Sequence, residues 1–131
     1  MRNKTARLLA WLLLAVTVLT GCKQNPTHAE LHQKLIAYFE GCGYTCRLSP
    51  LKDVQPDRDV PVYDATVWQL LTLDGEEVLL YFDESNRADY HLSRVDTDVY
   101  GHAARFGLRF LLVYPGEDAD VIRALESIPN D

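Results

Sequence analysis

Apolar residues recur along the chain at two different spacings, which separate its helices from its strands. From residue 31 to residue 42 they fall on one face of a helix. Thr27 and Glu30 have the spacing of a capping box, in which each side chain binds the backbone N–H of the other residue, so we expect the helix to begin there. Gly41 and Gly43 predict its end, because glycine adopts the left-handed conformation at little cost.

Strands are predicted where apolar residues alternate or run together, over residues 44–48, 65–73, 77–82 and 108–114. Asp74 and Gly75 separate the second run from the third and form a strong signal for a hairpin turn. The run from Val78 to Phe82 is apolar on both faces, so we place this strand centrally in a sheet.

Two further helices complete the predicted fold. Ser85 has the position of a cap for a short helix with Ala88 and Leu92 inward, and residues 118–128 form the last helix. Residues 96–107 between them read as an irregular connection. The order α-β-β-β-α-β-α predicts an α+β fold, a two-layer sandwich of about four mainly antiparallel strands with three helices, for which a ferredoxin-like variant is one topology.

The start of the chain has the composition of a secretory signal. Arg2, Lys4 and Arg7 precede an uncharged apolar run from Leu8 to Leu19. At about 1.5 Å per residue, this run is too short to cross a hydrocarbon core of roughly 30 Å as a helix. A short apolar run behind positive charge and before small residues is typical of a signal peptide, which takes no part in the fold.

The end of that run, Leu19-Thr20-Gly21-Cys22, resembles the lipobox of bacterial lipoproteins. The resemblance implies that Cys22 receives a diacylglycerol and becomes the new N-terminus. The alternative, a buried helix that ends in a chance cysteine, is disfavoured by the three basic residues and by this tetrapeptide. We therefore expect residues 1–21 to be a removed signal, residues 22–27 to be the lipidated cysteine and its tether, and residues 28–131 to form one domain.

The second half of the chain contains the segments "VWQLLTLDGEEVLLYFDES" and "GLRFLLVYPGEDADVIRALESI". Through them, roughly residues 65–128 resemble a group of small uncharacterised bacterial lipoproteins. Both resemblances imply a lipid-anchored domain on the extracytoplasmic face of a cell membrane. They do not distinguish an inner from an outer membrane, and they imply no catalytic activity.

The net charge of the mature chain disfavours some classes of binding partner. Three of the 13 Lys and Arg residues lie in residues 1–21, which leaves 10 against 19 Asp and Glu, a net charge of −9. Such a chain is repelled by nucleic acid phosphates and by anionic lipid headgroups. We expect no nucleic acid partner and no cofactor, a membrane contact through the N-terminal lipid, and a protein or another envelope component as partner.

Cys42 and Cys46 are four residues apart and have three interpretations. Outside the cytoplasm, a disulfide across the predicted glycine turn is the leading one. Two buried reduced thiols are the second. A redox pair is the third, although its spacing is one residue longer than Cys-x-x-Cys, and Cys42 lies near a helix end, where the helix dipole disfavours a thiolate.

Two more residue pairs are candidates for a site. His28 and His32 share one side of the first helix and are weak candidates for a metal site, which needs three or four ligands. Tyr100 and Phe106 lie in the predicted connection and are candidates for an exposed contact patch. No known catalytic motif is present, so we expect a non-enzymatic, protein-contact or accessory envelope lipoprotein. The alternatives are a thiol redox factor and a metal-binding module.

Overall fold

The computed structural model describes residues 27–51, 60–61 and 68–129. The predicted signal peptide, Cys22 and most of the tether lie outside these residues. The chain separates into two compact units, Met1–Lys34 and Leu35–Asp131, with the boundary inside the first described helix. None of the helices in the described ranges is long and apolar enough to cross a membrane.

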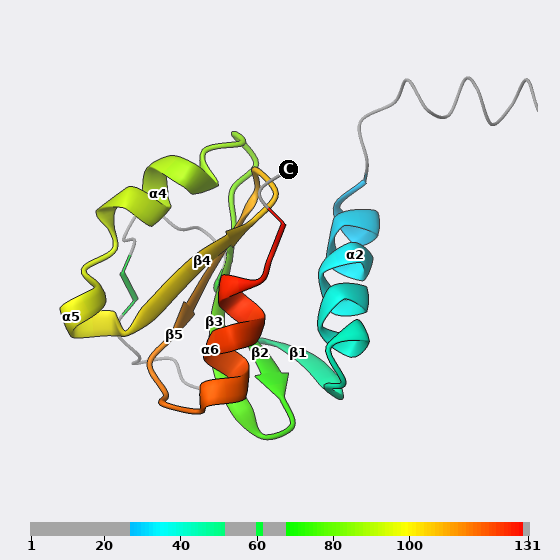
Figure 1. The fold of residues 1–131 in the computed structure, drawn as a ribbon. Coiled ribbons are helices and arrows are strands. Elements are labelled where there is room, and N and C mark those ends of the chain that lie inside the picture. Colours follow the sequence, from blue (N-terminus) through cyan, green and yellow to red (C-terminus); the bar gives the residue numbers. More distant parts are fainter. Residues whose placement is uncertain (1–26, 52–59, 62–67, 130–131) are drawn as a thin grey trace, which may run out of the picture. The chain divides into compact units, whose positions relative to one another are not determined.

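Nine helices and strands make up the described part of the chain (Figure 1). In chain order they are α2 (His28–Gly41), β1 (Cys46–Pro50), β2 (Trp68–Leu73), β3 (Glu76–Phe82), α4 (Ala88–Arg94), α5 (Thr97–Tyr100), β4 (His102–Phe106), β5 (Phe110–Tyr114) and α6 (Ala119–Glu126).

Helix α2 begins with the predicted capping box. The Thr27 backbone N–H donates to Glu30 Oε2 and the Glu30 backbone N–H donates to Thr27 Oγ1, each at 3.2 Å. These reciprocal bonds give partners to N–H groups that the first turn of a helix leaves without one. The beginning of the helix that the sequence predicts is therefore confirmed.

Helix α2 ends where its glycines predict. Gly43 has φ of 98° and its N–H donates to the Glu40 carbonyl, while the Tyr44 N–H donates to the Phe39 carbonyl. This pair of bonds is a Schellman motif, in which a left-handed residue reverses the chain and gives partners to the last helical carbonyls. The turn directs the chain into β1.

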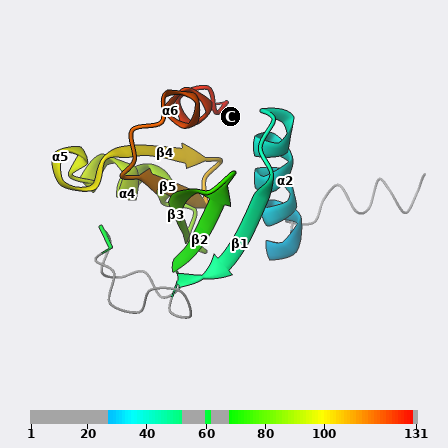
Figure 2. The same ribbon diagram turned by 90° about the horizontal axis from the view of Figure 1, so that it is seen from below.

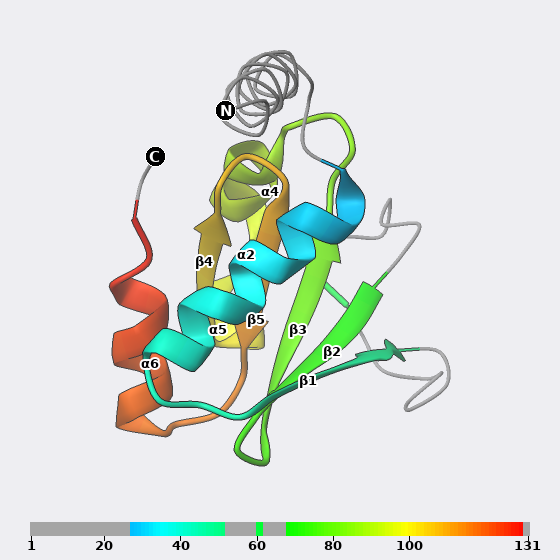
Figure 3. The same ribbon diagram turned by 90° about the vertical axis from the view of Figure 1, so that its right-hand side faces the viewer.

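The five strands form one antiparallel sheet in the order β1-β2-β3-β5-β4, so β3 is central as predicted (Figure 3). Asp74 and Gly75 join β2 to β3 with φ of 49° and 91°. Two successive positive φ values characterise the type I′ turn of a two-residue hairpin loop, which confirms the prediction for this dipeptide.

One face of the sheet carries a buried cluster under α4. Paired residues share a face, and the pairs Leu79–Val113 and Tyr81–Leu111 therefore lie together. With Leu51, Trp68 and Leu70 they form a hydrophobic cluster, and Leu92, Val95 and Tyr100 pack against it. The inward positions predicted for the short helix are those observed.

The other face of the sheet carries α6 and the part of α2 from Leu35 onward (Figure 2). Phe106 pairs with Phe110 on this face, and the Tyr38 ring lies 5.8 Å from the Phe106 ring. The Tyr38 hydroxyl donates to the Ala124 carbonyl in α6 at 2.6 Å. This hydrogen bond ties the end of α2 to α6, so the sheet and these two helices form two packed layers, and α4 adds cover on the opposite face.

The α+β class is confirmed, with more elements than the sequence predicts. The described residues hold five strands and four helices, and the two unpredicted elements, α5 and β4, come from the segment expected to be irregular. Because β5 lies between β3 and β4, these two strands are parallel and the helices between them form a split β-α-β crossover. This unit also occurs in ferredoxin-like folds, but here a meander of β1, β2 and β3 precedes it.

The beginning of α4 differs from the prediction in one residue. Ser85 does not cap the helix, because Arg87 holds the N-cap position and makes no side-chain capping bond. The Ser85 N–H instead donates to Asp83 Oδ1 at 2.7 Å. Ser85 therefore belongs to the turn that follows β3.

Candidate functional site

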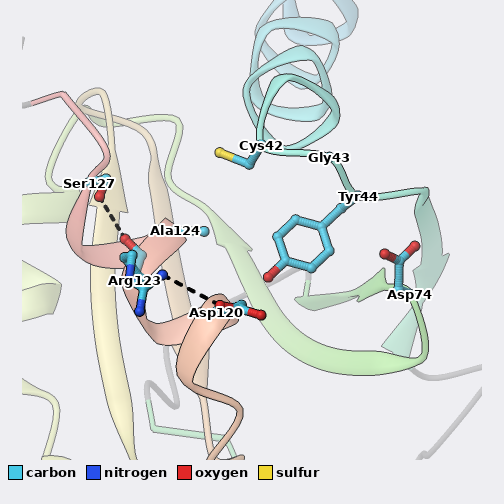
Figure 4. A pocket seen from close by; sticks show the side chains of 8 residues that line it. All are labelled: Cys42, Gly43, Tyr44, Asp74, Asp120, Arg123, Ala124 and Ser127. Carbon is cyan, nitrogen blue, oxygen red and sulfur yellow. Dashed lines mark hydrogen bonds and ion pairs between the residues drawn. The ribbon is translucent and has the colours of Figure 1, made fainter.

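A hollow of about 480 Å³ lies beside α6, opposite the turn that links α2 to β1 (Figure 4). Its lining is made of Cys42, Gly43, Tyr44, Asp74, Asp120, Arg123, Ala124 and Ser127. Figure 4 shows Cys42 and Tyr44 on one side of the hollow and the α6 residues on the other. Two segments far apart in the sequence thus meet around one exposed thiol.

Local hydrogen bonds fix both sides of this hollow. Asp74 Oδ1 accepts from the Thr45 N–H at 2.8 Å, and the Asp74 N–H donates to the Thr45 carbonyl, so the hairpin turn holds the start of β1. On α6, Asp118 Oδ1 accepts from the backbone N–H groups of Asp120 and Val121 and caps the helix. The predicted hairpin turn and the Asp118 cap, which the sequence did not indicate, therefore position the residues of the hollow.

The pKa shifts around the hollow favour the protonated, un-ionised forms. Burial, followed by the nearby Cys42, raises the pKa of Tyr38 to about 12. Burial, followed by Asp118 and Asp120, raises the pKa of Tyr44. Burial, followed by Glu40 and Asp74, raises the pKa of the Cys46 thiol. These tyrosines act as neutral hydrogen-bonding groups, and Cys46 holds little of the thiolate form that reacts.

The two cysteines do not form the expected disulfide, because both are free thiols in the structure. Cys42 is exposed, which also excludes the alternative of two buried thiols. It follows the last helical residue and faces the hollow, so the apolar stripe of α2 ends before it. Cys46 is half-buried, with its sulfur 4.0 Å from the carbonyl oxygens of Ile36 and Tyr44.

His28 and His32 lie as the helical spacing predicts, with their ring centroids 4.3 Å apart. His32 Nδ1 lies 2.8 Å from the His28 backbone carbonyl, so this nitrogen donates a hydrogen bond and is not free to bind a metal. No group of three His, Cys, Asp or Glu side chains with a metal-binding arrangement occurs within residues 27–51, 60–61 and 68–129.

Tyr100 and Phe106 do not form one contact patch. Tyr100 is half-buried and packs against the hydrophobic cluster under α4. Phe106 is also half-buried, and its ring contacts those of Tyr38 and Phe110 on the other face of the sheet. The segment that was expected to be irregular forms helix α5 and strand β4, and its two aromatic side chains therefore pack on opposite faces of the sheet.

The polar pair of Asp83 and His91 was missed by the sequence analysis. Their side chains meet at the end of β3, with His91 Nε2 2.8 Å from Asp83 Oδ2. Asp83 is 3% exposed and His91 is 6% exposed, and they line a pocket of about 240 Å³ together with Tyr81, Ser85 and Arg87. Within the described residues, Asp83 Oδ2 makes this ion-pair contact with His91 and has no hydrogen-bond partner.

The Asp83 carboxylate stays ionised despite its burial. Desolvation alone would raise its pKa, but hydrogen bonds from the Ser85 backbone and side chain, with a smaller contribution from His91, hold the pKa below its usual range. Ser85 therefore binds Asp83 rather than His91, so these three residues do not have the order of a Ser-His-Asp catalytic triad. The pair fastens α4 to the end of β3, and no local signal marks it, because Asp and His are usually exposed.

The fold and these clusters define a small α+β domain with an antiparallel five-stranded sheet, an exposed thiol in a hollow beside α6, and a buried Asp–His pair under α4. Comparisons with known protein families, with curated proteins and with solved structures found no match for the chain.

Proposed function

We propose that the chain is a lipid-anchored extracytoplasmic domain of the cell envelope that contacts another protein or envelope component. The observation that carries this proposal is the tetrapeptide Leu19-Thr20-Gly21-Cys22 at the end of a short apolar run with a basic start. A thioether-linked lipid at Cys22, together with further acyl chains, anchors a domain without a spanning helix.

The tether limits how far the domain reaches from the membrane. Four residues lie between Cys22 and Thr27, so five Cα–Cα steps separate the two. An extended chain spans about 3.5 Å per residue, so the first helix begins within roughly 18 Å of the lipid attachment. A domain held this close meets other proteins of the same membrane surface at a high effective concentration.

The lipid proposal is tested by intact mass spectrometry of the protein extracted from its own membranes. We expect a chain that begins at Cys22 and carries added lipid mass. The Cys22→Ser variant is the control, and it should keep residues 1–21 and gain no lipid. An unmodified wild-type chain that still begins at Met1 would overturn the proposal.

The contact proposal is tested by crosslinking in intact cells. Val99 on α5 is 68% exposed, so a photo-crosslinking residue there reaches outward without disturbing the core. We expect one reproducible partner band from this position that a crosslinker at the exposed Glu84 does not give. Monomer alone at both positions would contradict a lasting protein contact.

A thiol redox factor is the second candidate, favoured by one observation, the exposed thiol of Cys42 in the hollow beside α6. The raised pKa of Cys46 opposes it, because a resolving thiol must also ionise to complete a redox cycle. A metal-binding module built on His28 and His32 gains no support from the described residues, since one ring nitrogen of His32 is engaged by the backbone.

A further inference from the structure

Among the described strands, β4 forms one edge of the sheet and has a partner strand on one side only. Alternate residues of β4 point their N–H and C=O groups away from β5. No hydrogen bond reaches these groups from any other residue in the described ranges. Such an edge is a template for one more strand, because unpaired backbone groups gain hydrogen bonds when an extended chain lies beside them.

The other edge of the sheet is less suited to pairing. Strand β1 ends in Pro50, which has no N–H, and carries the exposed Arg47 at its second position. Strand β4 contains one strongly basic residue, Arg105. Its Nη1 donates to the Gly107 carbonyl at 3.1 Å, so the side chain lies against the turn between β4 and β5. Arg105 therefore does not cover the edge in the way that charged side chains commonly protect exposed strands.

A groove of about 390 Å³ runs beside this edge, between β4 and α6. Ala104 lies on the strand side, where its small side chain leaves space, and Ile122 and Leu125 lie on the helix side. The neighbouring Ala103 also borders the groove, but its side chain packs against the hydrophobic cluster on the opposite face of the sheet. A strand paired with β4 would place alternate side chains over this apolar floor, because successive residues of a strand point to opposite faces. The groove thus supplies pockets for side chains next to backbone groups that need partners.

The acidic residues around the groove favour a partner strand with basic side chains. Glu126 is the one acidic side chain among the residues that line it, and the lining residue Thr97 lies between the exposed Asp96 and Asp98. The whole chain has a formal net charge of −6. A basic partner is attracted to this surface, whereas a second copy of the same acidic chain is repelled from it.

We propose that β4 binds an extended peptide segment of a partner protein, with apolar residues over the groove and Lys or Arg residues facing Glu126 and its acidic neighbours. The five residues of β4 match a segment of five to seven residues, about 17–24 Å of strand. This inference rests on the protein-contact part of the proposed function and identifies its surface. It does not depend on the lipid at Cys22.

The test uses the full protein extracted in detergent and a fluorescent peptide of seven residues in which Val and Lys alternate, blocked at both ends. We expect saturable binding by fluorescence anisotropy. An otherwise identical peptide with Asp in place of Lys should bind at least tenfold more weakly. A Val–Lys peptide N-methylated at alternate residues should lose binding by a similar factor, because it cannot donate to β4.

Two variants locate the site. Glu126→Lys should weaken binding of the Val–Lys peptide about three- to tenfold and strengthen binding of the Val–Asp peptide. The matched control is Glu84→Lys, which makes the same charge change at an exposed residue away from the groove and should leave binding unchanged. Ala104→Leu fills the groove, so it should weaken binding without changing the charge. Thermal unfolding of each variant checks that it is folded.

Three results would overturn the inference. The first is that the Val–Lys peptide does not bind. The second is that the N-methylated peptide binds as tightly as the unmodified one, which would mean that charge alone holds the peptide. The third is a native dimer in which the β4 amides are already protected from hydrogen exchange. This result would mean that a second copy of the chain pairs with β4. Each of these results leaves the lipid at Cys22 untouched, because the mass measurement tests that part separately.

Discussion

His91 Nε2 lies 2.8 Å from Asp83 Oδ2, and both side chains are almost fully buried where α4 meets the end of β3. The contact brings a ring nitrogen of His91 to ion-pair distance of an ionised carboxylate, and no hydrogen bond from the described residues reaches Asp83 Oδ2. Two backbone bonds act beside this contact, from the Asp83 N–H to the Arg109 carbonyl and from the Ala88 N–H to the Leu108 carbonyl. The side-chain pair is therefore the part of this junction that depends on ionisation.

The first prediction concerns the stability of the domain in acid. The pKa of Asp83 is lower in the folded protein than its usual value of 3.8. Its contribution to stability is therefore complete above that value and is lost as the pH falls through the lower folded pKa. Asp83→Asn should lower the free energy of unfolding by roughly 1–3 kcal/mol near pH 7, because it weakens the bonds to a buried carboxylate.

The measurement is urea unfolding of both proteins from pH 7 to pH 2. The difference between wild type and Asp83→Asn should shrink as the pH falls below about 4. Asp89→Asn, at an exposed position in α4, is the control and should follow the wild type at every pH. A difference that stays constant across the range would show that Asp83 is not ionised in the folded protein.

The second prediction concerns the two thiols. Cys42 is exposed, whereas burial raises the pKa of Cys46 and encloses its sulfur in part. Iodoacetamide should label Cys42 in the native protein at least about tenfold faster than Cys46, and urea should bring the two rates together. Mass spectrometry of the digested protein measures both rates.

A Cys42→Ser variant gives the control for the labelling, since Cys46 should keep its slow rate there. If neither cysteine reacts with iodoacetamide until a reductant is added, the two form a disulfide. The sequence favours this disulfide, but both thiols are free in the structure. Equal and fast labelling would contradict the burial of Cys46.

Features encoded by neighbouring residues were predictable from the sequence. The capping box of Thr27 and Glu30 and the turn of Asp74 and Gly75 depend on residues within three positions of each other. The central place of β3 followed from its apolar residues on both faces. In each case the chemical signal and the structural feature occupy the same short segment.

Features that depend on distant partners were not predictable. Strand β4 consists of His102, two alanines, Arg105 and Phe106, a composition with low strand propensity, and it becomes a strand because β5 pairs with it. The contact of Asp83 with His91 joins two elements whose packing the sequence does not specify. The exposure of Cys42 depends on where α2 ends relative to the hollow. Tertiary packing decided all three.

The third prediction concerns Gly101 at the start of β4. A Cβ atom there would lie 2.4 Å from the Tyr114 carbonyl oxygen and 2.7 Å from Pro115 Cα, and the residue has φ of 96°. Both neighbours are backbone atoms, so they cannot move aside cheaply. Gly101→Ala should cost about 3 kcal/mol, through the overlap and through a conformation that alanine rarely adopts.

Gly41→Ala is the matched control, because a Cβ atom at Gly41 would meet nothing within 4 Å. It should be neutral or raise stability by about 0.5–1 kcal/mol, since alanine favours a helix more than glycine does. Thermal and urea unfolding compare the two variants. Equal stability of both would refute the close approach of β4 to Tyr114.

The last prediction concerns the buried hydroxyl of Tyr114, which joins the β2–β3 hairpin to α6. Tyr114 is 1% exposed, and its hydroxyl donates to Glu76 Oε2 at 2.5 Å and accepts from the Asp118 N–H at 3.1 Å. Tyr114→Phe keeps the ring and removes both bonds, so it should cost about 1–2 kcal/mol at neutral pH. Tyr90→Phe, at a side chain that is 44% exposed, should leave stability unchanged.

The pH dependence of stability distinguishes the hydrogen bond of the Tyr114 hydroxyl from the packing of its ring. Burial and the bond to Glu76 raise the pKa of Tyr114 above its usual value of 10.0. The stability that this neutral hydroxyl provides is therefore complete below pH 10 and is lost as the pH rises through the higher folded pKa. Unfolding experiments from pH 7 to pH 11 should show the wild type approaching Tyr114→Phe at alkaline pH. A gap that widens with pH would contradict a buried, neutral Tyr114 bonded to Glu76.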